Sequence, residues 1–383
     1  MFYPLAKQLN QKKELIEAFF KKQNILFPFY SSVDIRDSGF KFAPVDTNLF
    51  PAGFNNLSVL FMQNAVTAAK NYLTQNFPKV KKIGILPEAH TRNLMYLDNV
   101  EKLKKIIECA GYEVQVIPLD ETLKYAQVDL FILNNDLSAG LPDFLKDYAI
   151  PVIPAPKLGW HKRYKSWHFK KYQETIEEFC KETGIDPWLL GCYFEHVHEV
   201  DFNEEKNIDL VAKTVDEIIS KTQKKYDEYK IDQKPYVFVK NNRGTYGMGI
   251  LVIDSGAQLL ELNRREKNKM SVGKNKTLIE SVLVQEGVPS RLFNNQCPAE
   301  PVIYLFGSEV VGGFFRINCD RDSIGNLNSS GMGFETFRLE PLDKANDLIK
   351  ATTSGENYTL DYEHYFAYST VAKLAALAAA KEN

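Results

Sequence analysis

The chain has 383 residues, 44% of them hydrophobic and 25% charged, and its formal net charge is −2. This composition is typical of a globular protein, and a charge near zero argues against a broad basic surface for nucleic acid or an anionic membrane. Residues 1–22 lack the apolar core of a signal peptide, and the most apolar stretch, VAKLAALAAA, is too short to span a bilayer. We therefore expect a cytoplasmic protein that binds neither nucleic acid nor membrane.

The first elements are two helices that flank a hairpin. Apolar residues at helical spacing predict helices over Leu5–Lys22 and Asn56–Phe77. Between them, Val33–Asn48 is predicted to form two strands around a turn at Asp37-Ser38-Gly39.

This hairpin carries an acid, then an acid-x-Asn about a dozen residues later. The residues are Asp34, Asp46 and Asn48, and Pro51 and Gly53 follow them. Carboxylate and amide oxygens are the ligands that Mg²⁺ prefers, so the pattern predicts a magnesium site on the hairpin.

Residues 79–158 alternate between strands and a helix. KKIGIL, YEVQVIPL and VDLFILNN are predicted strands, and LMYLDNVEKLKKIIECAG is a predicted helix. Such alternation predicts a parallel, doubly wound sheet with ligand loops at the strand ends. PEAHTRN and NNDLSAG are the candidate loops, and the Pro-rich PVIPAPKLG is predicted to be a linker.

The remaining chain is predicted to be helical first and stranded later. Residues 165–230 are predicted to be largely helical, because SWHFKKYQETIEEFCKE and IDLVAKTVDEIISKTQKKYDEY carry helical spacing, and the chain ends in a predicted helix over 363–381. Predicted strands lie between these two parts, at 236–240, 250–253, 277–285, 301–306 and 310–317, before a polar loop over 318–333.

Two features carry little functional weight. The five cysteines contain no C-x-x-C pair, which favours reduced thiols over a disulfide or zinc framework. FEHVHEVDF places two histidines beside acidic residues, but alternating histidines on a strand mark an exposed face more often than a zinc site.

The segment VFVKNNRGTYGMGI is a candidate phosphate site. A strand ends at Lys240, and Gly244, Gly247 and Gly249 follow before the next strand. Glycines let backbone N–H groups approach phosphate oxygens, and a neighbouring lysine adds positive charge. A plain hairpin with a flexible glycine loop is the alternative.

Two later segments complete an ordered set. TLIESVLVQEGV is either a hinge that pairs with an adenine edge or an ordinary strand with an exposed acid. In the segment over 300–333, Arg316 lies on a strand and Asn326 and Asn328 on the loop that follows. A guanidinium can hold a carboxylate or a phosphoryl group by paired hydrogen bonds.

In this order, the three segments resemble the ATP-grasp superfamily, which encloses ATP between two sheets. The resemblance implies an α/β (α+β) chain with an ATP-grasp fold and a doubly wound domain before it. These enzymes carry the acid and acid-x-Asn pattern at the end of the fold, whereas here it lies near the front. We therefore expect a circular permutation that makes the metal-binding hairpin N-terminal, in which Val33–Asn48 pairs into the same sheet as Val310–Ile317.

The implied organisation has three parts. Residues 1–78 form a segment with the metal-binding hairpin that packs on the core, and 79–158 form the doubly wound domain. Residues 159–383 form the ATP-grasp domain, with a helical insertion at 165–230.

Nearly the whole chain resembles the ATP-grasp-type glutamate–cysteine ligases of some proteobacteria. The resemblance lies in VDIRDSGFKFAPVDTNLFPAGFNNL, PEAHTRN, LGWHKRYKSWHF and VKNNRGTYGMGI. It implies ATP-dependent ligation of the γ-carboxylate of L-glutamate to L-cysteine through γ-glutamyl phosphate, the first step of glutathione synthesis. The implied cofactors are ATP and two or more Mg²⁺ ions, and the sequence does not indicate an oligomeric state.

Chemistry assigns roles within this reaction. The metal ligands are Asp34, Asp46 and Asn48. The expected catalytic residues are Arg316, Lys240, Asn326 and Asn328. Arg316 would steady the transferring phosphoryl group, Lys240 would hold the α- and β-phosphates together with Lys165, and the two asparagines would line the same space. The ATP contacts are Lys165, Lys240, Gly244, Thr245, Gly247, Gly249, Gln285, Glu286 and Val288. Glutamate needs a cation for its α-carboxylate and an acid for its ammonium, and the candidates are Arg36, Glu88, His90, Arg92 and Asn93.

Two rival interpretations remain open. One is another ATP-grasp carboxylate–amine ligase that acts on a different amino acid or a peptide. The other is a nucleotide-binding regulatory protein without catalysis. The retained set of lysine, arginine and metal-ligand residues argues against the second.

Overall fold

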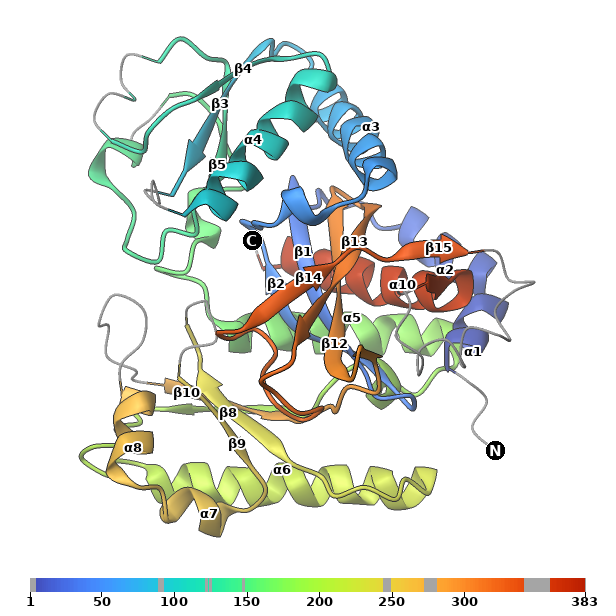
Figure 1. Ribbon diagram of the computed structural model, residues 1–383, viewed down its shortest axis with the longest axis vertical. Helices are drawn as coiled ribbons and strands as arrows, with labels where there is room; N and C mark the ends of the chain where they lie inside the picture. The colour runs from blue at the N-terminus through green and yellow to red at the C-terminus, as the bar shows by residue number, and fades with distance from the viewer. Residues whose placement is uncertain are drawn as a thin grey trace.

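The computed structural model describes residues 5–88, 93–120, 123, 126–146, 149–243, 249–271, 281–340 and 359–382. A central sheet lies between a parallel sheet above it and a smaller antiparallel sheet below it (Figure 1). In the described ranges, no helix is long and apolar enough to cross a membrane.

The central sheet has the order β14-β13-β12-β1-β2, with β11 beside β12, and its pairings are antiparallel. The hairpin β1–β2 therefore lies in the same sheet as β13, which confirms the predicted pairing. The strands are β1 (Tyr30–Asp37), β2 (Phe42–Asn48), β11 (Phe293–Asn294), β12 (Cys297–Phe306), β13 (Glu309–Asn318) and β14 (Met332–Glu335).

The C-terminal helix α10 (Tyr362–Ala380) packs against four strands of this sheet. Its second half is almost entirely apolar and is buried, because it runs between the sheet and α5 (Lys165–Thr183). The predicted helix over Leu5–Lys22 is instead two helices, α1 (Leu5–Gln11) and α2 (Lys13–Lys21), because the backbone leaves helical geometry at Lys12 (φ −101°, ψ 15°). A short turn, η1 (Phe54–Asn56), leads into α3 (Val59–Asn76), which packs on β12 and β13.

The upper sheet has the order β4-β3-β5-β6, and all its pairings are parallel, as predicted. Helix α4 (Leu94–Cys109) packs on β4 and α3. The strands are β3 (Lys82–Pro87), β4 (Glu113–Val116), β5 (Leu130–Asn134) and β6 (Val152–Ile153). The carboxyl ends of β3 and β5 meet at one edge, and that edge is attached to the central sheet by the Tyr30 hydroxyl, which donates to the carbonyl of Leu133 (2.8 Å).

The lower sheet has the order β7-β10-β8-β9, and α6 (Ile208–Tyr229) covers its outer face (Figure 1). Its strands are β7 (Phe194–His198), β8 (Val237–Asn241), β9 (Ile250–Ile253) and β10 (Ser281–Glu286). The predicted helical stretch 165–230 thus contains strand β7, because FEHVH alternates along its length and pairs with β10. The shorter elements are η3 (Asp143–Leu145), η4 (Pro156–Leu158), η5 (Pro187–Leu190), α7 (Gly256–Leu260), α8 (Arg264–Ser271), β15 (Arg338–Glu340) and β16 (Thr359–Asp361).

The expectation of reduced cysteines is wrong for one pair. Cys297 begins β12 and Cys319 follows β13, and the two form a disulfide with Cα atoms 4.4 Å apart. The β12–β13 register, which pairs Ala299 with Ile317, brings them together. A search for closely spaced cysteines cannot detect a pair that the strand register creates.

Candidate active site

The register of the central sheet gathers charged side chains on one face. Asp34 on β1 lies opposite Asp46 on β2, and on its other side it lies opposite Val302 of β12. Two residues before Val302, Glu300 lies opposite Arg316 of β13. Because side chains alternate along strands, these four charged residues share a face.

A buried ion network joins three of these residues to Arg36. Nη1 of Arg316 lies 2.6 Å from Oδ2 of Asp34 and 2.7 Å from Oε1 of Glu300. Nε of Arg36 donates to Oε2 of Glu300 (2.7 Å). Burial raises the pKa of Asp34 to about 6, against the opposing effect of the Arg316 charge.

Two lysines lie beside the other end of this face. Nζ of Lys165, at the start of α5, lies 2.7 Å from Oδ1 of Asp46. Burial would raise the pKa of Asp46, but the charges of Lys165 and Lys240 outweigh it and lower the pKa to about 2. Burial and the Lys165 charge lower the pKa of Lys240 to about 8. Nζ of Lys240 donates to the carbonyl of Val45 (3.1 Å).

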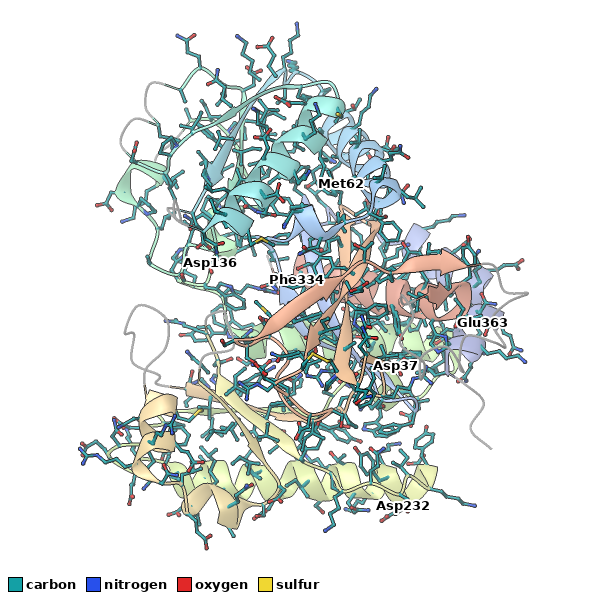
Figure 2. The ribbon with its side chains drawn as sticks, in the orientation of Figure 1. Asp37, Met62, Asp136, Asp232, Phe334 and Glu363 are labelled. Carbon is teal, nitrogen blue, oxygen red and sulfur yellow. A yellow bond between two sulfur atoms is a disulfide. The ribbon has the colours of Figure 1, made fainter. Side chains whose placement is uncertain are left out.

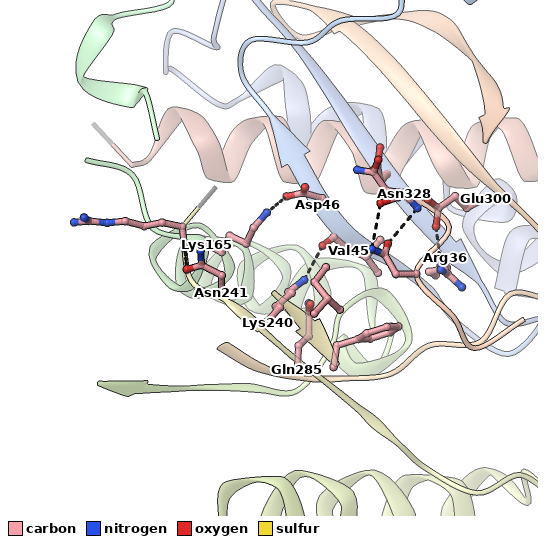
Figure 3. A pocket seen from close by; sticks show the side chains of 14 residues that line it. Arg36, Val45, Asp46, Lys165, Lys240, Asn241, Gln285, Glu300 and Asn328 are labelled. Carbon is pink, nitrogen blue, oxygen red and sulfur yellow. Dashed lines mark hydrogen bonds and ion pairs between the residues drawn. The ribbon is translucent and has the colours of Figure 1, made fainter. Parts of the chain in front are cut away.

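A cavity of about 70 Å³ lies between the central and lower sheets, and Figure 3 shows its side chains. Its lower side is apolar at Phe238 and Ile250. Gln285 is buried there, and its Nε2 has no hydrogen-bond partner among the described residues. The lining residues are Asp34, Arg36, Val45, Asp46, Lys165, Phe238, Lys240, Asn241, Arg243, Ile250, Gln285, Glu300, Asn326 and Asn328.

A second cavity of about 260 Å³ lies between the central sheet and the edge of the upper sheet. It shares Asp46 and Asn328 with the smaller cavity, and Arg316 lines it as well. Most of its remaining lining is polar on the side of β3 and β5 and apolar on the side of β13 and β14.

The structure brings most predicted site residues to these two cavities. The predicted residues at the smaller one are Asp34, Arg36, Asp46, Lys165, Lys240, Gln285, Asn326 and Asn328. Those at the larger one are Asp46, Asn48, Glu88, Asn93, Arg316 and Asn328. Gly244, Thr245, Gly247, His90 and Arg92 lie outside the described residues.

Three predicted residues are placed elsewhere or are otherwise engaged. The Glu286 carboxylate is fully buried and accepts hydrogen bonds from Lys41 Nζ (2.8 Å) and Trp188 Nε1, so it faces away from the cavity. Val288 is buried in an apolar cluster below β2. The carbonyl of Gly249 accepts from the backbone N–H of Asn241 (2.9 Å), and the expected phosphate contact of Gly249 stays a prediction.

Arg36 lines the cavity but is occupied by the protein itself. Besides Glu300, it donates to the carbonyls of Ser323 and Gly325 in the loop before Asn326. This geometry supports the loop and leaves little of the guanidinium for a glutamate carboxylate.

Sequence reasoning missed Glu300 and the C-terminal Glu382. Glu300 forms ion pairs with both Arg36 and Arg316. The only signal in the sequence is the alternation of side chains along the strands, which would put Glu300 on the same face as Arg316. Oε2 of Glu382 lies 2.7 Å from Nε of Arg163, and its Oε1 lies 2.6 Å from Nδ1 of His168. Arg163 also donates to the carbonyl of Thr47, which is next to Asp46. No local pattern connects residues so far apart in the chain.

Comparisons with known proteins show the family to which the chain belongs. The model of the glutamate–cysteine ligase family, GshA, matches residues 6–128 and 122–383. The crystal structure of a protein from Methylobacillus flagellatus KT, assigned as a gamma-glutamylcysteine synthetase, superimposes with a TM-score of 0.86. It is 36% identical, and the match covers 99% of this chain and 95% of that chain. The chain is therefore a ligase and belongs to the glutamate–cysteine ligase family.

The structure of a glutathione synthetase-like effector from Globodera pallida in apo form is only distantly similar. Its TM-score is 0.39 at 12% identity, over 82% of this chain and 75% of that chain. No curated protein sequence matches the chain significantly.

Proposed function

We propose that the chain joins the γ-carboxylate of L-glutamate to the amino group of L-cysteine at the expense of ATP, as the first step of glutathione biosynthesis. The observation that carries this proposal is the pair of cavities that meet at Asp46 and Asn328. The smaller cavity contains two lysines that can bind a polyphosphate. The larger cavity has a size and a polar lining that suit amino acids.

The proposed fold is a circularly permuted ATP-grasp fold. Two antiparallel sheets enclose the smaller cavity, and the parallel sheet of residues 79–158 precedes the lower sheet in the chain. Glu382, which follows α10, forms an ion pair with Arg163, and Arg163 donates to the carbonyl of Thr47 on β2. The start of β1 lies at the same end of the hairpin, because Ser32 pairs with Asn48. The proximity of the chain's end to the hairpin supports a permutation that moved β1–β2 to the front.

We propose that the smaller cavity marks the nucleotide site by the chemistry of its lining rather than by its volume. Lys165 and Lys240 offer positive charge for phosphates, and Phe238 and Ile250 offer apolar surface for a base. The unpartnered Nε2 of Gln285 supplies a donor for a base edge. We propose that the loop with Gly244, Thr245 and Gly247 covers the phosphates.

The site also fits Mg²⁺ by the chemistry of its donors. Within the described ranges, no group of three or more His, Cys, Asp and Glu side chains is arranged as a metal site. Asp34, Asp46 and the amide of Asn328 nevertheless supply oxygen donors at the smaller cavity. Asn48 follows Asp46 by two residues on β2 and lines the larger cavity. When bound, the metal would neutralise phosphate charge. We propose that these residues hold it.

The proposed reaction has two steps. A γ-carboxylate oxygen of glutamate bonds to the γ-phosphorus of ATP, and the bond to ADP breaks. The cysteine nitrogen then bonds to the acyl carbon, phosphate leaves with the electron pair, and the amine loses a proton. Lys165 lies beside Asp46 and Arg316 lies beside Asp34. The two cations would therefore stabilise the negative charge of the phosphoryl group as it passes from ATP to glutamate.

The test is ADP release by the purified protein with Mg²⁺, ATP and L-glutamate, with and without L-cysteine, and mass analysis of the product. Cysteine-dependent ADP release with a γ-glutamylcysteine mass is the expected result. ADP release with another amine only would show a different ligase. Asp46→Asn should reduce turnover by orders of magnitude, whereas a regulatory nucleotide binder would only bind more weakly.

A further inference from the structure

Three apolar side chains form a wall on one side of the larger cavity. Phe314 lies on β13, and Met332 and Phe334 lie on the edge strand β14. The rings of Phe314 and Phe334 meet edge to face, with centroids 5.2 Å apart. Met332 and Phe334 are 39% and 37% exposed. Single exposed apolar residues need no explanation, but these side chains converge on one cavity.

The wall stands beside the guanidinium of Arg316, which lines the larger cavity. The β13–β14 register pairs Arg316 with Phe334, so their side chains share a face. Nε of Arg316 is buried and has no hydrogen-bond partner among the described residues. The larger cavity therefore has a guanidinium at one end of the wall and apolar surface along it.

The opposite side of the cavity is polar. Glu88 follows β3, Asn93 caps the start of α4, and Asp136 follows β5, and all three line the cavity. Figure 2 labels Phe334, on β14 of the central sheet, and Asp136, in the loop after β5 of the upper sheet. Carboxylates on this side suit the ammonium group of an amino acid.

We propose that the wall of Phe314, Met332 and Phe334 holds the side chain of the acceptor amino acid, the cysteine thiol. This inference rests on the proposed function and adds the residues that select the acceptor. At about 260 Å³ the cavity is smaller than the roughly 300–1,000 Å³ of a site for a drug-sized ligand. Its size therefore suits amino acids.

The chemistry of the two substrates decides which one meets the wall. A thiol with a pKa of about 8.5 is neutral at pH 7, and sulfur packs favourably against aromatic rings. Both ends of glutamate are charged, and a carboxylate against apolar side chains would lose its hydration without a partner. A serine hydroxyl would lose its hydrogen bonds in the same way, so the wall also selects against serine.

Phe334→Ala tests the inference, and Phe293→Ala on β11 is the matched control. Phe293 is 38% exposed and belongs to the same sheet, but it lines neither cavity. The measurements are the KM values for glutamate and cysteine and isotope scrambling in labelled ATP with glutamate alone. Scrambling reports γ-glutamyl phosphate formation without the acceptor.

For Phe334→Ala we expect unchanged scrambling and a KM for cysteine that rises about tenfold. The preference for L-2-aminobutyrate, whose ethyl side chain resembles the thiol in size, over L-serine should fall about tenfold. Met332→Ala should act in the same direction, with the equally exposed Ile324→Ala (39%) as its control.

A raised KM for glutamate with an unchanged KM for cysteine and an unchanged acceptor preference would overturn the assignment of the wall. If the wild-type enzyme shows neither scrambling nor ADP release, the proposed function itself fails, and this inference fails with it. Scrambling in the wild type without a cysteine effect in either variant would overturn the inference alone.

Discussion

Nζ of Lys165 lies 2.7 Å from Oδ1 of Asp46, and this ion pair stands where the two cavities meet. The lysine comes from the start of α5 and the acid from β2, so the contact ties the helix to the N-terminal hairpin. The lysine ammonium group therefore lies at the smaller cavity, next to an acid that lines both cavities.

Lys165→Met should reduce kcat about 10²–10³-fold, because it removes a preorganised charge at the point of phosphoryl transfer. Lys162→Met, which changes an exposed lysine three residues earlier, is the control and should leave the rate unchanged. Steady-state ADP release measures both variants. A fall in kcat of equal size in the control would contradict the role.

Glu300→Ala should destabilise the fold by about 3–5 kcal/mol, because Arg36 and Arg316 would each lose a buried partner. Urea unfolding monitored by fluorescence gives the change in the free energy of unfolding. The exposed Glu309→Ala in the same sheet should change stability by less than about 1 kcal/mol. Equal effects would show that the Glu300 network does not hold the sheet face together.

The affinity for ATP should fall as the pH rises above about 8. The pKa of Lys240 is lowered to about 8 by burial and by Lys165, so the free enzyme loses this positive charge at alkaline pH. Bound phosphates favour the charged form, hence binding is strongest below the pKa of the free enzyme. The pH profile of kcat/KM for ATP should show this alkaline limb, and Lys240→Arg should move it to higher pH. An unchanged limb in Lys240→Arg would assign it to another group.

Glu382→Gln should destabilise the protein at neutral pH but not in strong acid. The Arg163 charge outweighs burial and lowers the pKa of Glu382 to about 2, below its unfolded value of about 4.3. A lowered carboxylate pKa gives stability that is present above the unfolded value and is lost as the pH falls toward the folded one. The difference in unfolding free energy between wild type and variant should therefore shrink between about pH 4 and pH 2.

Lys381→Ala serves as the neighbouring control for Glu382→Gln. Its partner Glu178 is more than half exposed, and exposed pairs contribute about 0–1 kcal/mol. A pH-independent effect of Glu382→Gln would show that the Arg163 contact does not carry the stability.

The elements that the sequence predicted well depend on local patterns. The hairpin at Val33–Asn48, the parallel strands and the strand that ends near Lys240 follow from alternation, turn residues and helical spacing, all of which are set within a few residues. The chemical type of most site residues was also predictable, because phosphate and Mg²⁺ require cations and oxygen donors.

Tertiary structure decided where each side chain points and which distant residues meet. Lys41 forms an ion pair with Glu286 in the core, and Glu300 forms one with Arg36 at the cavity. The Cys297–Cys319 bond and the contact of Glu382 with Arg163 join residues that only strand register and helix packing bring together. The sequence by itself determined the strands, the helices and the kinds of reactive group. Their assembly into two cavities that meet at Asp46 depended on long-range pairing, because burial and partner choice are properties of the packed chain.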